Sequence, residues 1–285
     1  MRLGVIFGLI SLAACERATT DSEVLDGVPT DTTDTTDVTD TTDTTDTTDT
    51  GDTTVPTVDC TPGPETTGPW DTHPITVAGS SAVYDALSND SGLGAVRTAA
   101  LEATEATTVD LAVDGAIVTA RGYLPATATD ITMWLQDAGG AVYAYRVAIA
   151  EIENLSDITP GSAVAFTATE VQNYFGTPQL DTLSGFSITS SGNDVPVVNG
   201  MTTTLSYEAH GEQLVEIWGE LVADNGGCGG SSTCFDLEYG DQTLIYRTAS
   251  EFDKVGDCIH VIAPLTQFSG ELQVNVNDFD WARFY

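Results

Sequence analysis

The sequence predicts a mostly β fold, with two tandem five-stranded barrels after a disordered tether rich in Thr and Asp. Two observations lead to this fold class. From Val109 onward, short stretches of alternating apolar and polar residues are separated by Gly, Asn and Asp, which is the pattern of strands and turns. The two halves of this β-rich region also resemble each other, which indicates an internal repeat and therefore two domains of the same kind.

The internal repeat can be followed strand by strand. Residues 111–118 align with 214–221, and a predicted hairpin at Gly176 aligns with one at Gly270. The other corresponding segments are 131–137 with 235–239, 142–146 with 243–247, and 159–164 with 254–259. Five strands with a variable insert between the third and the fourth is the strand order of an OB-fold barrel. Each half is therefore predicted to form one OB-like barrel.

Three motifs in the first half strengthen this assignment. They are Leu135-Gln136-Asp137, Pro160-Gly161-Ser162-Ala163-Val164 and Tyr174-Phe175-Gly176-Thr177-Pro178-Gln179-Leu180. With these motifs the chain resembles bacterial secreted OB-fold modules, although Ser162 stands where those modules usually have an acid. The resemblance implies barrels over residues 108–198 and 208–285. Such modules accompany secreted nucleases and other exported enzymes, and some bind nucleic acid, so the fold alone does not define the ligand.

The N-terminus predicts export and a lipid anchor. Arg2 precedes an apolar stretch at residues 3–12, which is too short for a membrane-spanning helix of about twenty residues but has the size of a signal-peptide core. The next string, Leu12-Ala13-Ala14-Cys15, resembles the lipobox of bacterial lipoproteins. The resemblance implies cleavage of residues 1–14, diacylglyceryl on the Cys15 thiol and acylation of the new amine. An ordinary secretory signal with a chance cysteine is the alternative.

Residues 15–60 are predicted to form a disordered tether. The Asp-Thr-Thr repeat from Asp31 to Thr54 has no apolar periodicity, so it cannot bury enough surface to offset its chain entropy. We interpret it as a spacer that lifts the folded part off a membrane. O-glycosylation of its threonines is a further reading; calcium binding by its acids is disfavoured, because such sites need oxygens fixed by a turn. Residues 61–107 follow as a Pro/Gly-rich arm with a short helix expected at 81–89.

The charge of the chain bears on its partners. It has 43 acidic and 8 basic residues, for a formal net charge of −35. Because affinity for nucleic acid comes mainly from basic side chains, we do not expect nucleic acid as a partner. The expected partners are the lipid bilayer, through acylated Cys15, and a protein or glycan ligand. Glu16, which follows the lipidated cysteine, favours the outer membrane of a bacterial cell envelope.

Four further cysteines indicate disulfides, because an exported protein meets an oxidising environment. Cys228 and Cys234 flank a short loop rich in glycine and serine, and we favour this pair. Cys60 would then pair with Cys258, although spacing leaves two other connectivities open. A zinc site formed by Cys228, Cys234, Cys258 and His260 is an alternative whose spacing matches no common zinc pattern. We expect no metal and no cofactor.

Three side chains are candidates for ligand contacts. Ile131, Met133 and Leu135 alternate and should face the core, so Trp134 should point outward, where an OB-fold barrel binds its ligands. Packing of Trp134 under the arm is the alternative. Arg146 and Arg247 occupy equivalent strand ends and could hold an acidic ligand, or form structural ion pairs with nearby carboxylates. By the repeat alignment, Tyr143 and Tyr145 should belong to the core.

No catalytic constellation is evident in the sequence. The three histidines are scattered, and neither a nucleophile elbow nor a phosphate-binding loop occurs. We therefore expect a non-enzymatic, surface-tethered lipoprotein that binds a partner protein or glycan through its barrels. An accessory module of an extracellular nuclease or polysaccharide-degrading system is the first alternative. A carboxylate-dependent hydrolase is the second, since linear spacing does not show whether two carboxylates face each other across a cleft.

Overall fold

The computed structural model describes residue 60 and residues 92–122, 124–125, 127–276 and 282–284. The predicted signal peptide, the Thr/Asp tether and the helix expected at 81–89 lie outside these residues. Both barrels belong to one unit of the chain, Val58–Tyr285. Within the described ranges, no helix combines the length and the apolar character needed to cross a membrane.

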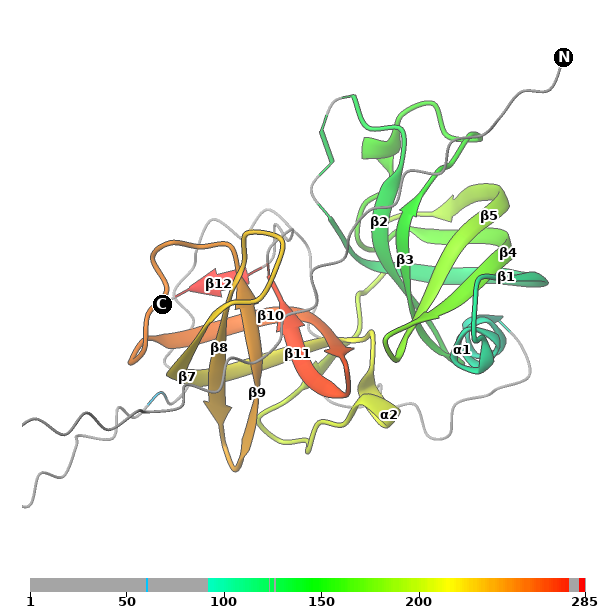
Figure 1. Cartoon of the computed structure of the whole chain (residues 1–285). Coiled ribbons are helices and arrows are strands. Elements are labelled where there is room, and N and C mark those ends of the chain that lie inside the picture. Colours follow the sequence, from blue (N-terminus) through cyan, green and yellow to red (C-terminus); the bar gives the residue numbers. More distant parts are fainter. Residues whose placement is uncertain (1–59, 61–91, 123, 126, 277–281, 285) are drawn as a thin grey trace, which may run out of the picture. The chain divides into compact units, whose positions relative to one another are not determined.

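The first barrel confirms the predicted fold class. Its five strands close in the order β1-β2-β3-β5-β4, with β1 antiparallel to both β2 and β4 (Figure 1). The parallel pair β3–β5 completes the ring. The strands are β1 (Thr107–Arg121), β2 (Ile131–Asp137), β3 (Gly140–Val147), β4 (Ala163–Tyr174) and β5 (Thr177–Ser190).

The second barrel has the same strand order, which confirms the internal repeat. Strands β7, β8, β9, β11 and β10 are neighbours in that order, and the pairing of β10 with β7 closes the ring (Figure 1). Two short strands extend it, with β6 beside β7 and β12 beside β10. The strands are β6 (Val197–Asn199), β7 (Leu214–Gly227), β8 (Thr233–Tyr239), β9 (Gln242–Thr248), β10 (Cys258–Phe268), β11 (Glu271–Asn275) and β12 (Ala282–Phe284).

A helix that the sequence reading missed covers the first barrel. Helix α1 (Gly92–Glu102) buries Leu93, Val96 and Ala100 in the core of that barrel. These residues follow helical spacing, so they form a single apolar stripe. The barrel also fixes the start of the helix, because Asp137 Oδ2 accepts a hydrogen bond of 2.8 Å from the Leu93 amide. The other helices within the described residues are a 3-10 turn, η2 (Leu155–Asp157), and the single-turn α2 (Tyr207–His210).

Three of the predicted core residues and both predicted hairpins are found where the sequence placed them. Ile131, Met133 and Leu135 all lie in the core of the first barrel. The hairpin at Gly176 has two left-handed central residues, with φ of 51° at Phe175 and 97° at Gly176. Its counterpart at Gly270 repeats this geometry, with φ of 54° at the preceding serine and 87° at the glycine. Positive φ at both central residues matches the right-handed twist of the strands that the turn joins.

Both favoured disulfides are present. Cys228 is bonded to Cys234, with their Cα atoms 5.8 Å apart, and Cys60 is bonded to Cys258, with a Cα separation of 5.4 Å. These bonds use all three cysteines of the zinc alternative, which is therefore wrong: a disulfide sulfur is no longer the thiolate that zinc requires.

The two barrels share a buried apolar junction. Trp134 of β2 lies in it and is 4% exposed, so the indole faces the second barrel. The other fully buried members of this cluster are Ala120, Val195, Val197, Leu214 and Ile262. The junction therefore draws on strands of both barrels and on the segment that links them.

A buried carboxylate lies at the edge of this junction. Glu212 has no exposed surface, and its two oxygens accept hydrogen bonds from Trp134 Nε1 at 3.0 Å and from the Tyr207 hydroxyl at 2.8 Å. Arg97 of α1 donates to the backbone carbonyls of Tyr207 and Gly211 and lies over the Tyr207 ring. One polar network thus connects α1, β2 and the segment after α2.

Burial changes the acidity of this carboxylate. Loss of hydration raises the pKa of Glu212 to about 7, although the hydrogen bonds from Tyr207 and Trp134 and the charge of Arg97 act in the opposite direction. An unfolded glutamate has a pKa near 4.5. As pH rises from 4.5 to 7, the unfolded state therefore loses this proton while the folded state keeps it, so Glu212 lowers the stability of the fold over that range.

We predict that Glu212→Gln removes this pH dependence. The amide keeps an oxygen acceptor for Trp134, and the Tyr207 hydroxyl can turn to accept from the new amide N–H. The variant should match the parent protein at pH 5 and exceed it in unfolding free energy at pH 8, by up to roughly 3 kcal/mol. Urea titrations at both pH values measure this difference.

Glu208→Gln is the matched control, because it removes the same charge from an exposed position in α2. Its unfolding free energy should change in parallel with that of the parent protein between pH 5 and pH 8. Equal pH dependence in Glu212→Gln and the parent protein would show that the buried carboxylate does not titrate as described.

Candidate functional site

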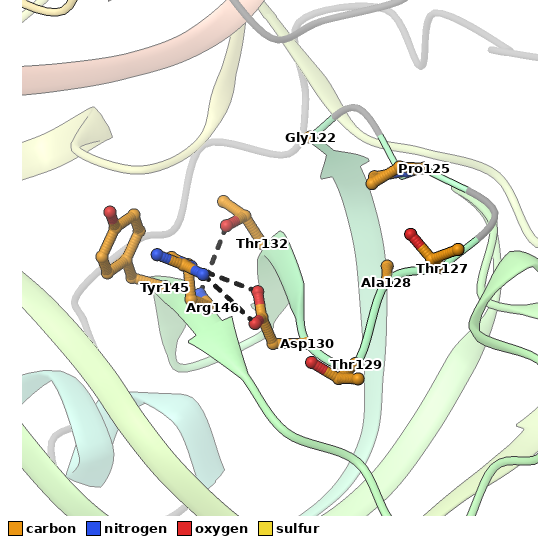
Figure 2. Close-up of a pocket in the computed structure, with 9 residues that line it drawn as sticks. All are labelled: Gly122, Pro125, Thr127, Ala128, Thr129, Asp130, Thr132, Tyr145 and Arg146. Carbon is orange, nitrogen blue, oxygen red and sulfur yellow. Dashed lines mark hydrogen bonds and ion pairs between the residues drawn. The ribbon is translucent and has the colours of Figure 1, made fainter.

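A hollow lies at one end of the first barrel, between the β1–β2 connection and the end of β3. Its volume is about 410 Å³. Figure 2 shows Arg146 beside Asp130, with Tyr145 at one edge of the site and Pro125 and Thr127 of the connection at the other. The described residues that line it are Gly122, Pro125, Thr127, Ala128, Thr129, Asp130, Thr132, Tyr145 and Arg146.

A β-bulge in β3 creates one wall of this hollow. Met133 pairs with Ala144 and Ile131 pairs with Val147, so Tyr145 and Arg146 together stand opposite the single residue Thr132. The extra residue interrupts the alternation of the strand, and both side chains are exposed as a result. Arg146 has a φ of 50°, a left-handed conformation that is costly for a residue with a long side chain.

Arg146 forms an ion pair with Asp130 across the hollow. Its Nε lies 3.2 Å from Oδ1, and its Nη2 donates to Oδ2 at 3.4 Å. The Arg146 amide donates to the Thr132 hydroxyl at 3.2 Å (Figure 2). The hydrogen bond and the negative charge of Asp130 raise the pKa of the guanidinium above its ordinary value. The Arg146 side chain is 63% exposed, so water screens the pair and it adds little to stability.

A row of aromatic rings leads from the barrel junction to this hollow. The Trp134 and Tyr143 ring centroids are 4.6 Å apart, and those of Tyr143 and Tyr145 are 5.8 Å apart. Our expectation that both tyrosines belong to the barrel core is wrong. Val142 and Ala144 face the core instead. Tyr143 packs against the junction, and Tyr145, on the same face of the strand, is 45% exposed.

Trp134 occupies a different environment from the one the sequence suggested. It points away from the core of its own barrel, as the alternation predicted, but the second barrel covers it. With its N–H bonded to Glu212, the indole is not accessible as a ligand contact in this arrangement. The sequence could not reveal this, because a side chain that leaves one domain can still be buried by the next.

The two arginine candidates do not converge on one site. Arg247 of β9 donates from Nη2 to the Gly229 carbonyl at 3.1 Å, within the loop that the Cys228–Cys234 bond closes. Arg146 lies at the hollow of the other barrel. The sequence suggested three side chains as ligand contacts. Among them, Arg146 is the one that lines the hollow.

The site also contains residues that the sequence reading did not single out, namely Asp130, Tyr145 and the threonines of the β1–β2 connection. The repeat alignment pairs residues 142–146 with the equally long segment 243–247, so it gave no sign of the bulge. Among the described residues, no group of three His, Cys, Asp or Glu side chains is placed to hold a metal ion.

No protein-family model and no curated protein matches this chain. Solved structures similar to it include the tetrameric p202 HIN2, with 12% identity, a TM-score of 0.32, and coverage of 65% of this chain and 97% of that chain. The Ifi202 HINa domain in complex with 20-base-pair double-stranded DNA is 8% identical, with a TM-score of 0.29 and coverage of 61% and 95%. A murine DNA-binding protein bound to double-stranded DNA is 9% identical, with a TM-score of 0.32 and coverage of 59% and 91%.

These comparisons correct one expectation. From the charge of the chain we did not expect nucleic acid as a partner, yet two of the matched structures contain double-stranded DNA. That ligand belongs to those proteins, and their likeness to this chain concerns the fold. The resemblance to bacterial secreted modules stays a prediction.

Proposed function

We propose that this protein is a non-enzymatic, lipid-anchored binding protein of a bacterial cell envelope, and that the hollow at Tyr145 and Arg146 holds an uncharged glycan. The observation that carries this proposal is the bulge in β3, which presents two adjacent side chains to one hollow. Bulges are over-represented next to functional sites, where they redirect side chains.

The chemistry of the hollow suits a saccharide. A sugar ring has an apolar C–H face, which the exposed Tyr145 ring can cover, and neighbouring hydroxyls that both donate and accept. The Arg146 guanidinium only donates and the Asp130 carboxylate only accepts, so the pair can hold two hydroxyls at once. Their charges cancel, and the hydroxyls of Thr127 and Thr129 add uncharged polar groups. The volume of about 410 Å³ lies within the usual range for small-ligand sites.

The energetics of Arg146 favour binding over a structural role. Its left-handed backbone costs stability, and its exposed ion pair recovers little of that cost. A residue kept for the fold alone would more often be glycine or asparagine at this φ. We infer that the guanidinium is retained for what it contacts in the hollow.

The proposed anchor explains where such a site would act. Acyl chains on Cys15 would hold the chain to the bilayer, since stable attachment takes two or more lipid groups. Residues 15–60 would then separate the barrels from the lipid surface. A glycan receptor held in this way would meet saccharides of the envelope or of its surroundings.

We predict that Arg146→Asn separates binding from stability. Asparagine tolerates the left-handed conformation, so the melting temperature should stay the same or rise, while the guanidinium donors are lost. Screening the full chain on a glycan array identifies a saccharide, and calorimetric titration of that saccharide should then show at least a tenfold loss of affinity in Arg146→Asn and in Tyr145→Ala.

Phe252→Ala is the control, because it removes an exposed aromatic ring, 90% accessible, from a loop of the second barrel. It should bind the saccharide as the parent protein does. An array with no bound glycan, or equal binding by all three variants, would refute the proposal. Oligonucleotide binding that depends on Tyr145 and Arg146 would assign the hollow to nucleic acid instead.

The lipid anchor has its own prediction. Cys15→Ser removes the thiol that the proposed lipid is attached to, so the variant should leave the membrane fraction and the detergent phase. Intact mass measurement of the parent protein should show the mass of the acyl chains. A mature protein without that mass would contradict the lipoprotein assignment and leave the glycan proposal untouched.

A further inference from the structure

The two equivalent hairpins of the barrels meet, and they carry exposed aromatic rings. Tyr174 and Phe175 belong to the β4–β5 hairpin, and Phe268 belongs to the β10–β11 hairpin. Their exposed fractions are 44%, 50% and 45%. We call these three residues the hairpin cluster. Large exposed apolar side chains that gather in one place often mark a binding surface.

The hairpin cluster is held together from both barrels. The ring centroids of Tyr174 and Phe175 are 4.9 Å apart at an angle of 89°, and those of Phe175 and Phe268 are 5.1 Å apart. Gln267 Nε2 donates to the Gly176 carbonyl at 2.7 Å, and the Thr177 hydroxyl donates to the Gln267 carbonyl at 2.8 Å. The rings are thus presented by two fixed turns rather than by long loops.

Phe175 occupies a position that its own backbone disfavours. It is the first central residue of its turn, with a φ of 51°, where asparagine, aspartate and glycine are preferred. The equivalent residue of the second barrel is Ser269, with nearly the same φ of 54°. The first barrel therefore carries an aromatic ring where a small residue suffices for the same turn in the second barrel.

The charges around the hairpin cluster indicate the kind of partner. Glu271 is exposed and pairs with Phe268 in the β10–β11 ladder. Glu102 is exposed beside Leu101, whose carbonyl accepts a hydrogen bond of 3.0 Å from Asn173 Nδ2 in the other hairpin. Five basic side chains of the described residues make their contacts elsewhere: Arg97 at the junction, Arg121 at Ile158, Arg146 at Asp130, Arg247 at Gly229 and Lys254 at Asp257.

We propose that the hairpin cluster docks an arginine-rich, positively charged segment of a partner protein. Guanidinium groups stack on aromatic faces, and carboxylates beside those faces strengthen the attraction. The formal net charge of −35 draws such a segment to the protein over a longer range. The proposal concerns a second surface and does not depend on the glycan site.

The test uses charge-neutral substitutions, because any polycation will be attracted to so acidic a chain. Calorimetric titration of the full mature chain with a capped hexa-arginine peptide measures affinity. Phe175→Asn and Tyr174→Ser should each weaken binding about two- to fivefold. Ser269→Asn is the control, because it introduces asparagine into the equivalent turn without removing a ring. This variant should bind hexa-arginine as tightly as the parent protein does.

A structural role for the rings is tested in the same variants. Phe175→Asn places a favoured residue in the turn, so its melting temperature should not fall. If it does fall, Tyr174→Ser decides the question, since its ring contact is with Phe175 of the same hairpin. The proposal is overturned if neither variant loses affinity, or if a hexa-glutamine peptide binds as tightly. It is also overturned if Phe175→Asn abolishes self-association of the chain while hexa-arginine fails to bind.

Discussion

The indole N–H of Trp134 points out of the first barrel into a region from which water is excluded, and the Glu212 carboxylate accepts its hydrogen bond. A buried donor without an acceptor would cost more than an ordinary hydrogen bond contributes. The other oxygen of that carboxylate accepts a hydrogen bond from the Tyr207 hydroxyl, and Arg97 donates to the Tyr207 backbone carbonyl. The position of α1, the segment after α2 and the contact between the barrels are therefore set by the same buried polar groups.

The two surface sites follow from how each barrel departs from regular geometry. In β3 the bulge breaks the alternation that would have placed one of Tyr145 and Arg146 in the core. At the β4–β5 turn, Phe175 adopts a left-handed conformation without being glycine or asparagine. Both departures cost stability, and both place large side chains in water. Strained residues that are also exposed are reasonable positions at which to look for binding, because backbone strain of this kind clusters at functional sites.

Much of the architecture could be predicted from the sequence because it rests on local pattern. The alternation of side chains along a strand predicted Ile131, Met133 and Leu135 as core residues. The equivalent glycines at 176 and 270 predicted the two hairpins. The short glycine-rich loop between Cys228 and Cys234 indicated a disulfide that the structure contains. These features depend on neighbours in the sequence or on the strand period of two residues.

The candidate sites were harder to predict because they depend on contacts between distant segments. Trp134 leaves its own barrel as expected, but it is buried by segments far along the chain, and its hydrogen-bond acceptor Glu212 is 78 residues away. The repeat alignment misassigned Tyr145 to the core, although it lies on the same face of β3 as Tyr143. The short helix was expected at 81–89, and helix α1 was missed because its apolar stripe of Leu93, Val96 and Ala100 is short.

The disulfide between Cys60 and Cys258 has a mechanical consequence. It joins positions 198 residues apart, so residue 60 is covalently connected to β10 as well as to the chain that follows it. If the N-terminal segment were pulled from a membrane, tension would pass through this bond directly into β10, which pairs with β7, β11 and β12. Helix α1 and the strands of the first barrel lie inside the closed covalent loop. A load applied between residue 60 and the chain after Cys258 would therefore bypass the backbone of the first barrel.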